Sequence, residues 1–364
     1  MESPDVSEKE IFGSSHQYFY KTDTDFIARG SFGIVYKAVL TGASNLLGTF
    51  VAVKVVHVPK ESEILVNLKK WTNWGDRMKI LLGLAHEHIA AYHKITITRP
   101  FRGAFVEIVM DYYHGGDLAC FLYGLRKNGI RLDRATATRY AIEITDGVHF
   151  LHQKGLVHGD LKPGNVFIKH LDNDHERDTL VIGDLDDFVQ MQRSVTCSGD
   201  ITHVRGTIRF MSPEMLKRFA TLNSEIPGRK TDIWSVGCIM LELAHCITGS
   251  KRKRLKKNWR IVEAGYRMSD THFATLVIDG YVPAVTNRNL LPAELVACMQ
   301  RCLHRNSEKR VSADELLKKL LCVDPLNTPA IIARKEIKHT IQRFRKHRGQ
   351  IITDAWRLPL LLQP

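Results

Sequence analysis

The sequence predicts an α+β protein with two lobes: a small antiparallel β-sheet with one main helix, followed by a larger, mainly α-helical lobe. Residues 23–57 alternate apolar and polar side chains and are rich in Val, Ile, Phe and Tyr, which is typical of strands. The apolar spacing lengthens from about residue 60, and helical patterns dominate beyond residue 115. A length of 364 residues with 44% hydrophobic content supplies enough apolar material for two cores.

Composition divides the chain into three segments. Residues 1–20 form a polar lead-in, residues 21–322 form the folded domain, and residues 323–364 form a basic tail. Within the domain we expect the N-terminal lobe to cover about residues 21–110 and the C-terminal lobe about residues 114–322.

The N-terminus and the cysteines bear on the cellular compartment. The first ten residues, MESPDVSEKE, are polar and acidic, and no run of 18 apolar residues occurs, so we expect neither a secretory signal nor a transmembrane segment. The seven cysteines show no paired CxxC spacing, which favours reduced thiols over disulfides or a zinc site. We therefore expect a cytoplasmic protein, with the nucleus as the alternative.

Two short stretches carry the whole net charge of +13. Residues 251–260, KRKRLKKNWR, hold seven basic side chains, and residues 333–348, ARKEIKHTIQRFRKHR, hold seven basic and one acidic. A nucleic-acid enzyme usually spreads positive charge along a groove, so we expect no direct nucleic-acid binding. Residues 251–260 are either a solvated insertion or a docking site for an acidic partner or an import receptor. Residues 333–348 either pack on the C-terminal lobe or bind a partner or membrane surface as a basic amphipathic helix.

Two glycines and a lysine near the N-terminus suggest a phosphate site. Gly30 and Gly33 lie between two expected strands, where they form either an ordinary hairpin turn or a loop whose backbone N–H groups approach phosphates. Lys54 follows about twenty residues later in the apolar strand VAVK. A cation in an apolar strand is costly without an anionic partner, so the combination favours the phosphate loop.

The stretch GLVHGDLKPGNVFI, residues 155–168, concentrates polar side chains between two apolar runs. Phosphoryl transfer needs a carboxylate to orient the attacking hydroxyl, a cation to offset charge on the phosphoryl group, and oxygen ligands for Mg²⁺. Asp160, Lys162 and Asn165 match these roles in that order. The next apolar strand, LVI, ends close to Asp184, which supplies a further hard oxygen ligand.

In their content and order these motifs, from about Phe26 to Leu321, resemble the eukaryotic protein kinases. The resemblance implies ATP and Mg²⁺ as cofactors, Asp160 as catalytic base, Lys162 as a catalytic cation, and Asn165 and Asp184 as metal ligands. The ATP-binding residues that it implies are Ile27, Ala28, Gly30, Ser31, Phe32, Gly33, Val35, Ala52, Lys54, Met110, Asp111, Tyr113 and Asp117.

Later motifs bear on the substrate. HGD followed by GN also occurs in small-molecule phosphotransferases of the aminoglycoside and choline type, which share this fold. The segment GTIRFMSPE, the helix DIWSVG and a late arginine instead resemble protein kinases, which implies protein substrates. Lys162 and Thr207 resemble the Ser/Thr type, with a loose likeness to mitogen-activated protein kinase kinase kinases. The residues implied in the activation segment and its supports are His158, Thr207, Glu214, Asp232 and Arg310.

Several positions depart from the family pattern. Ala28 replaces the first loop glycine, a change of one methyl group. Gly159 replaces the arginine that often precedes the catalytic aspartate and pairs with an activation-loop phosphate, so we expect activity without that phosphate. Asp186 replaces the glycine after the metal-binding aspartate and adds negative charge there. A register that places Asp187 in the metal-binding role is the alternative.

The helix glutamate that should pair with Lys54 is missing from its slot. Counting back from His86 places Arg77 there, and an arginine facing Lys54 would repel it. Asp76 or Glu63 would take the role in a shifted or rearranged helix. This gap supports a second hypothesis, a pseudokinase-like scaffold that binds nucleotide without efficient transfer.

Overall fold

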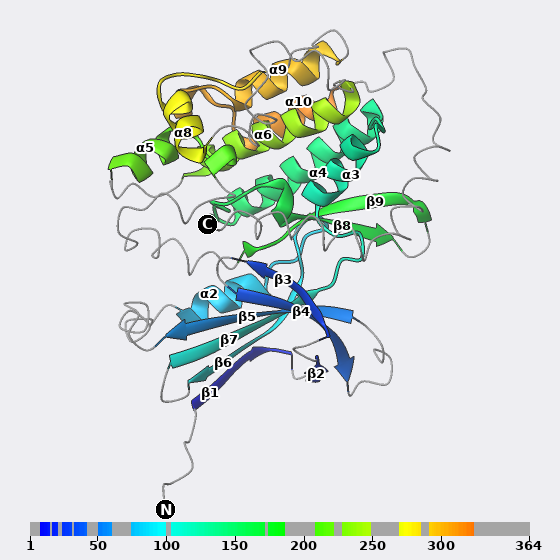
Figure 1. Ribbon diagram of the computed structural model, residues 1–364, viewed down its shortest axis with the longest axis vertical. Helices are drawn as coiled ribbons and strands as arrows, with labels where there is room; N and C mark the ends of the chain where they lie inside the picture. The colour runs from blue at the N-terminus through cyan, green and yellow to red at the C-terminus, as the bar shows by residue number, and fades with distance from the viewer. Residues whose placement is uncertain are drawn as a thin grey trace, which may run out of the picture. The chain divides into compact units, whose positions relative to one another are not determined.

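A computed structural model gives the fold as two compact units (Figure 1). The N-terminal unit ends at His114 and the C-terminal unit begins at Gly115, and each is described by itself. The residues that the structure describes are 8–14, 17–20, 24–30, 33–41, 50–59, 74–99, 103–171, 174–185, 208–221, 228–248, 269–284 and 291–323.

The N-terminal unit is built on an antiparallel seven-stranded sheet, whose order is β1-β6-β7-β5-β4-β2, with β3 pairing a further part of β4. Figure 1 shows its strands in blue to cyan. The expected strands over 23–57 are confirmed as β3 to β5, and two more follow before residue 112. The bounds are β1 Glu8–Gly13, β2 Gln17–Phe19, β3 Phe26–Gly30, β4 Gly33–Thr41, β5 Phe50–Pro59, β6 Tyr92–Arg99 and β7 Gly103–Asp111.

One face of this sheet carries a closely packed apolar core. Ala38, Val51, Val53 and Val109 are each at most 1% exposed, and they pack with partly buried hydrophobic residues that include two tyrosines. Alternation along a strand places residues two apart on the same face, and the β-branched valines suit a half-buried pleated surface. The hydrophobic alternation read from the sequence therefore fixes which face is covered.

The described part of the lead-in contributes two strands to this sheet. β1 pairs with β6 from Glu8↔Arg99 to Gly13↔Lys94, and β2 pairs with β4. Tyr18 and Tyr20 then donate hydrogen bonds to the Glu107 carboxylate, at 2.7 and 3.0 Å. Burial and the Glu107 carboxylate raise the pKa of both phenols. The runs EKEIFG and QYF form these two strands, although the segment is polar on average.

Helix α2, Trp74–Leu82, is the one described helix of the N-terminal unit. It packs against β1 and β6. Met78 and Leu81, three residues apart on one face of the helix, are fully buried. The prediction of a sheet with one main helix matches the described residues.

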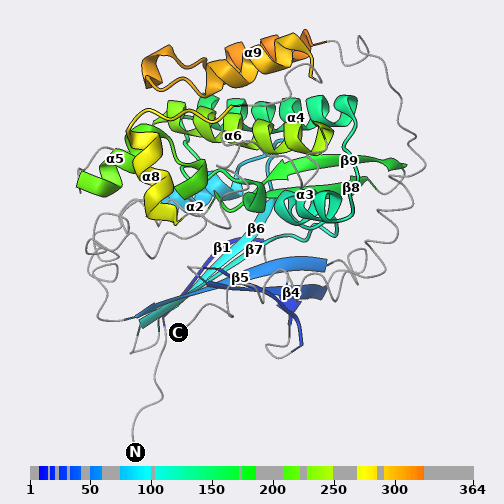
Figure 2. The same ribbon diagram turned by 45° about the horizontal axis from the view of Figure 1, so that its top comes forward.

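The C-terminal unit is mainly α-helical, as predicted, with one antiparallel hairpin. Figure 2 shows α4 and α6 running alongside each other, and the two helices are in contact. The hairpin packs on α4 through β9. The bounds are α3 Leu118–Lys127, α4 Arg134–Gln153, β8 Val166–Leu171, β9 Asp174–Ile182, α5 Pro213–Thr221, α6 Arg229–Thr248, α8 Asp270–Ile278, α9 Ala293–Cys302 and α10 Ala313–Leu321.

Helix α6 confirms the prediction of a buried helix. Every residue from Thr231 to Ile247 is buried, in keeping with a sequence that is apolar on all sides. Trp234 is 1% exposed and is the largest fully buried side chain of the described residues. No helix within the described ranges is long and apolar enough to cross a membrane. The α+β fold class is thus confirmed.

Gly237 of α6 lies close to the C-terminal end of α9. A Cβ atom there would lie 2.7 Å from Cys302 Cβ and 2.9 Å from Leu303 Cδ2. We expect Gly237→Ala to lower the free energy of unfolding by about 1–3 kcal/mol, because these atoms lie near the backbone and must shift. Thermal and urea unfolding measure the change. Gly228→Ala is the control, since its Cβ meets nothing within 4 Å. Equal stability of the two variants would contradict the expectation.

Candidate active site

The loop from Gly155 to Asn165, between α4 and β8, is held by a buried carboxylate. Asp232, in the first turn of α6, is 1% exposed. Its Oδ2 accepts a hydrogen bond from His158 N–H and its Oδ1 accepts one from Gly159 N–H, both at 2.9 Å. His152 Nε2, on the last turn of α4, lies 2.9 Å from Oδ2 as a third partner. The loop backbone is therefore fixed to two helices at once.

His158 is an internal support and does not face solvent, since it is 4% exposed. Its Nε2 lies 3.0 Å from the Gly183 carbonyl oxygen, and its Nδ1 accepts from Asp160 N–H at 3.3 Å. A carbonyl oxygen can only accept, so His158 Nε2 is the donor in this hydrogen bond. The ring links the loop that carries Asp160 to the residue that precedes Asp184.

The structure brings Asp160, Lys162 and Asn165 together, as the sequence predicts. Lys162 Nζ donates to Asp160 Oδ2 at 2.5 Å. Asn165 Nδ2 donates to the Asp160 carbonyl oxygen at 2.8 Å and approaches Oδ2 at 3.4 Å. The other carboxylate oxygen, Asp160 Oδ1, is buried and has no hydrogen-bond partner within the described structure. Because a buried acceptor is costly to leave unused, Oδ1 is the atom best placed to receive a hydroxyl proton.

Asn165 and Asp184 lie at the same end of the β8–β9 hairpin. Val166 pairs with Ile182, and Gly183 N–H donates to the Asn165 carbonyl at 2.9 Å. Outside glycine, Asp184 alone of the described residues has a positive φ, 60°. A left-handed backbone is a moderate cost for aspartate, and a strained residue of this kind is a frequent sign of function.

This pair of oxygen donors fits Mg²⁺. The Asn165 amide turns its nitrogen to the Asp160 carbonyl, which leaves its Oδ1 facing the opposite way. Mg²⁺ takes hard oxygen ligands and is usually bound by one or two carboxylates together with substrate phosphates, not by a cage made entirely of protein. The described residues contain no group of three or more His, Cys, Asp or Glu side chains that could hold a metal ion.

Five of the predicted ATP-binding residues share one face of the sheet. The register pairs Ala28 with Val35, Val35 with Lys54, and Ala52 with Met110, and cross-strand partners lie on the same face. This face is opposite the one that carries the valine core. Ala28, Val35, Ala52 and Met110 thus share this face with Lys54, which is 7% exposed. Such a face suits an apolar ring and a phosphate chain laid along it.

The other predicted ATP-binding residues are placed as follows. Gly30 pairs with Gly33 at the end of the β3–β4 hairpin, and Ile27 lies at the irregularity between Phe26 and Ala28. Asp111 points to the opposite face of the sheet, where its Oδ1 lies 2.6 Å from His93 Nε2. In the C-terminal unit, Asp117 caps α3 by accepting from Cys120 N–H at 2.8 Å.

Burial raises the pKa of two residues in this stretch. For Tyr113 the main cause is burial, to which the neighbouring Asp111 charge adds. For Asp117 burial outweighs the hydrogen bonds of the helix N-terminus, so its pKa is raised in spite of them. A carboxyl group held in this way accepts hydrogen bonds in a partly apolar setting, which is compatible with a contact to a ribose hydroxyl.

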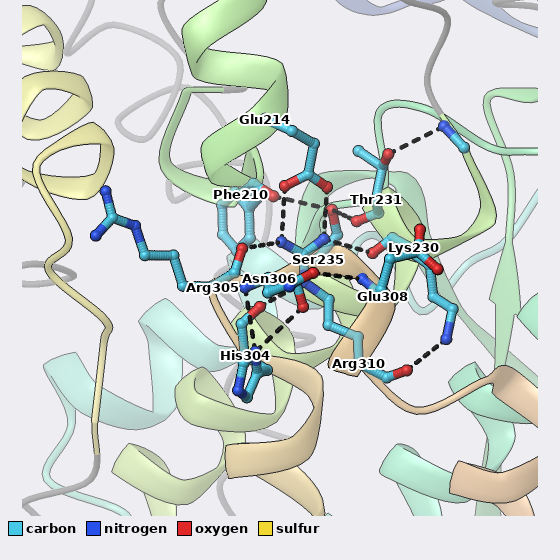
Figure 3. Close-up of polar contacts among 11 residues, drawn as sticks. Phe210, Glu214, Lys230, Thr231, Ser235, His304, Arg305, Asn306, Glu308 and Arg310 are labelled. Atoms are coloured by element: carbon cyan, nitrogen blue, oxygen red, sulfur yellow. Dashed lines mark hydrogen bonds and ion pairs between the residues drawn. The ribbon is translucent and has the colours of Figure 1, made fainter.

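Arg310, which is buried, and Glu214, which is partly exposed, form a bidentate ion pair (Figure 3). Arg310 Nη1 and Nη2 donate to Glu214 Oε1 and Oε2 at 2.5 and 2.7 Å. The guanidinium, 0% exposed, also donates Nε–H to the His304 carbonyl at 2.7 Å, and its Cζ lies 5.1 Å from the centroid of the Trp234 ring. The sequence predicts this pair, and a planar fork of donors is what such a site requires.

Some predicted residues lie outside what the structure describes. Arg77 and Asp76 fall within α2, but their side chains are not described, so the partner of Lys54 stays a prediction. The same holds for Ser31, Phe32, Glu63, Asp186, Asp187, Thr207 and the basic stretches 251–260 and 333–348.

Sequence reasoning missed two supports on α4. His152 and Glu143 are 6% and 7% exposed, and each is a polar side chain on the buried face of a helix. Their signal in the sequence is a polar residue at an apolar position of the 3.6-residue pattern. That signal shows that a partner is needed and does not show which one.

The Glu214 ion pair makes stability depend on pH. Burial alone would raise the pKa of Glu214, but the hydrogen bonds and charge of Arg310 outweigh burial and hold it below its ordinary value of 4.5. A depressed pKa adds stability above the ordinary value, and this stability is lost as pH falls through the lower folded-state value. We expect Glu214→Gln to lower the free energy of unfolding by about 1.5–3 kcal/mol at pH 7, and by less in acid. Unfolding of both proteins is measured from pH 7 to pH 3. A difference in the free energy of unfolding that stays constant over this range would contradict the expectation.

Comparison with known proteins places the chain in a family. The model of the protein kinase domain matches residues 22–321. Serine/threonine-protein kinase SSK22 of Saccharomyces cerevisiae is 29% identical over 304 residues, covering 80% of this chain and 20% of that protein. Mitogen-activated protein kinase kinase kinase 4 of Homo sapiens is 26% identical, with 80% and 15% covered. Mitogen-activated protein kinase kinase kinase 17 of Arabidopsis thaliana is 26% identical, with 87% and 75% covered. The chain spans about a fifth of the length of SSK22, and it belongs to the protein kinase family.

Proposed function

We propose that this protein transfers the γ-phosphate of ATP to Ser and Thr hydroxyls of protein substrates in intracellular signalling. The observation that carries the proposal is the Asp160 carboxylate, whose Oδ2 is held by Lys162 while its Oδ1 is buried without a hydrogen-bond partner in the described structure. Membership of the protein kinase family and relatives named as Ser/Thr and mitogen-activated kinases support the same reaction.

Asp160 orients the attacking hydroxyl. The substrate O–H donates to Asp160 Oδ1, which aims the hydroxyl oxygen at the phosphoryl group and accepts the proton as the new P–O bond forms. Asn165 fixes the Asp160 backbone, and His158 fixes its N–H, so the carboxylate does not need to reorganise during the reaction. Lys162, already beside Oδ2, offsets negative charge on the transferred phosphoryl group.

Asn165 and Asp184 would hold Mg²⁺, which neutralises phosphate charge when it is bound. The apolar face formed by Ala28, Val35, Ala52 and Met110 takes the nucleotide, and Lys54 on that face grips its phosphates. Positioning and electrostatics supply nearly all of the catalysis in phosphoryl transfer, and these residues supply both.

The finer assignments follow the same pattern. We propose that Lys162 and Thr207 select Ser and Thr hydroxyls. We also propose that residues 251–260 and 333–348 bind docking partners or direct the protein within the cell. The protein would be cytoplasmic, and it would enter the nucleus if residues 251–260 act as an import signal. The concentration of the net charge in two short stretches of an otherwise neutral sequence supports the proposal.

Replacing Asp160 tests the reaction. We expect Asp160→Asn to lower kcat for phosphate transfer from ATP to a generic basic protein by at least about 100-fold, because the amide cannot accept the hydroxyl proton as a carboxylate does. Asp279→Asn, an exposed position at the end of α8, is the matched control and should transfer at the wild-type rate. Wild-type transfer no faster than that of Asp160→Asn, with ATP still bound, would favour the scaffold hypothesis. Transfer to small alcohols but not to proteins would favour a small-molecule phosphotransferase.

Phosphatase treatment tests the role of Gly159. This residue has a φ of 78°, and its N–H is held by Asp232, but it carries no cation for an activation-loop phosphate. We expect the purified protein to keep most of its activity after complete dephosphorylation, measured by the same transfer assay. A protein kinase with arginine at this position, treated in parallel, shows that the phosphatase works. A large loss of activity would count against the expectation.

A further inference from the structure

Glu143 lies in the middle of α4, far from the loop that carries Asp160 in the sequence, and is 7% exposed. Its Oε2 accepts a hydrogen bond from Leu180 N–H at 2.8 Å, and its Oε1 accepts one from Arg139 Nη1 at 2.6 Å. A carboxylate in a helix face that packs inward is costly unless both oxygens find donors. Here both do, and one of the donors belongs to β9.

The bond to Leu180 lies on the edge of β9 that faces α4. β9 pairs with β8 along its other edge, in the register Ile168↔Leu180. N–H and C=O groups of alternate residues in an antiparallel strand point to opposite edges, so residues 178 and 180 present theirs to the same side. Arg139 Nη1 donates to the Asp178 carbonyl oxygen, which lies on that side. One turn of α4 thus clamps two successive outward groups of β9.

The same helix also supports the catalytic loop. His152, nine residues after Glu143, contacts the Asp232 carboxylate that binds the loop backbone. Nine residues of α-helix span about 13.5 Å, a fixed distance because helices are stiff. α4 therefore holds the strand that delivers Asp184 and the loop that presents Asp160 on a single rigid element.

We propose that Glu143 is a positioning residue for the metal ligand Asp184. Its hydrogen bond to Leu180 fixes the position of β9 along α4. Asp184 follows Leu180 by four residues, at the end of the hairpin where Asn165 also lies. The inference rests on the proposed function, since it concerns the same Mg²⁺ site. What it requires is an acceptor at position 143, not a charge, and this separates it from a purely electrostatic role.

A Mg²⁺ titration of nucleotide binding tests the proposal. The full chain is titrated with Mg²⁺ in the presence of a fluorescent ATP analogue, and the midpoint is recorded. We expect Glu143→Leu to raise the Mg²⁺ midpoint about tenfold, the lower end of the effect of losing an outer support of a metal site. Glu143→Gln keeps an acceptor oxygen of the same length, so its midpoint should stay close to that of the wild type.

A control separates positioning from loss of stability. Leu316→Ala removes a fully buried side chain of α10, a helix that packs on α4 and is not part of the β8–β9 hairpin. We expect this variant to melt at a lower temperature and to keep the wild-type Mg²⁺ midpoint. A raised midpoint in Leu316→Ala would show that general loosening moves the metal site, and the assignment to Glu143 would be withdrawn.

An unchanged Mg²⁺ midpoint in folded Glu143→Leu, when the wild type binds nucleotide normally, would overturn this inference and leave the proposed function standing. If Glu143→Leu does not fold, Glu143→Asp keeps the charge but withdraws the acceptor by one methylene. Faster amide exchange at Leu180 in Glu143→Asp shows that its hydrogen bond is weakened. If the Mg²⁺ midpoint is then unchanged, the inference is overturned, and if the midpoint is raised, the inference is supported. A wild type without Mg²⁺-dependent nucleotide binding would overturn the proposed function and this inference with it.

Discussion

The Asp232 carboxylate is the acceptor on which the arrangement of the catalytic loop depends. It joins α6 to the backbone of His158 and Gly159 and to the side chain of His152. At 1% exposure no water can replace these bonds, so each donor that lost Asp232 would bear the cost of burial unpaired. The loop conformation and the placement of Asp160 thus depend on one buried carboxylate with three partners, which also joins α6 to α4 through His152.

This site depends on holding its side chains rigidly in position. Asp160, Lys162 and Asn165 are ordinary side chains, and their neighbours fix their geometry before any substrate arrives. Donors and acceptors that are held in place beforehand lose little free energy to reorganisation during a reaction. Helices α4 and α6 can serve as such a support because they pack in the protein interior, and a closely packed interior resists small displacements.

Sequence patterns predicted the α+β class, the strands over 23–57, the buried α6 and the grouping of Asp160, Lys162 and Asn165. Local spacing suffices for the last of these, since six consecutive residues of one loop cannot be far apart. It also predicted Arg310 with Glu214, although this pair depended on family resemblance because 96 residues separate the two. It did not find Glu143 or His152, whose partners are a backbone N–H and a side chain of other elements. A tertiary contact of that kind is visible in the sequence only as a polar residue at an apolar position of the helical pattern, and its partner cannot be identified from the sequence.

The tyrosines that precede the family match have a consequence for how the domain is delimited. Tyr18 and Tyr20 cover the valine face of the sheet and end on Glu107, while the match to the protein kinase family begins at residue 22. Cutting the chain at that boundary would uncover apolar side chains and strip both hydroxyl donors from a glutamate. The folded unit therefore extends N-terminal to the family match, and a chain that began at residue 22 would lose β1 and β2 from the sheet.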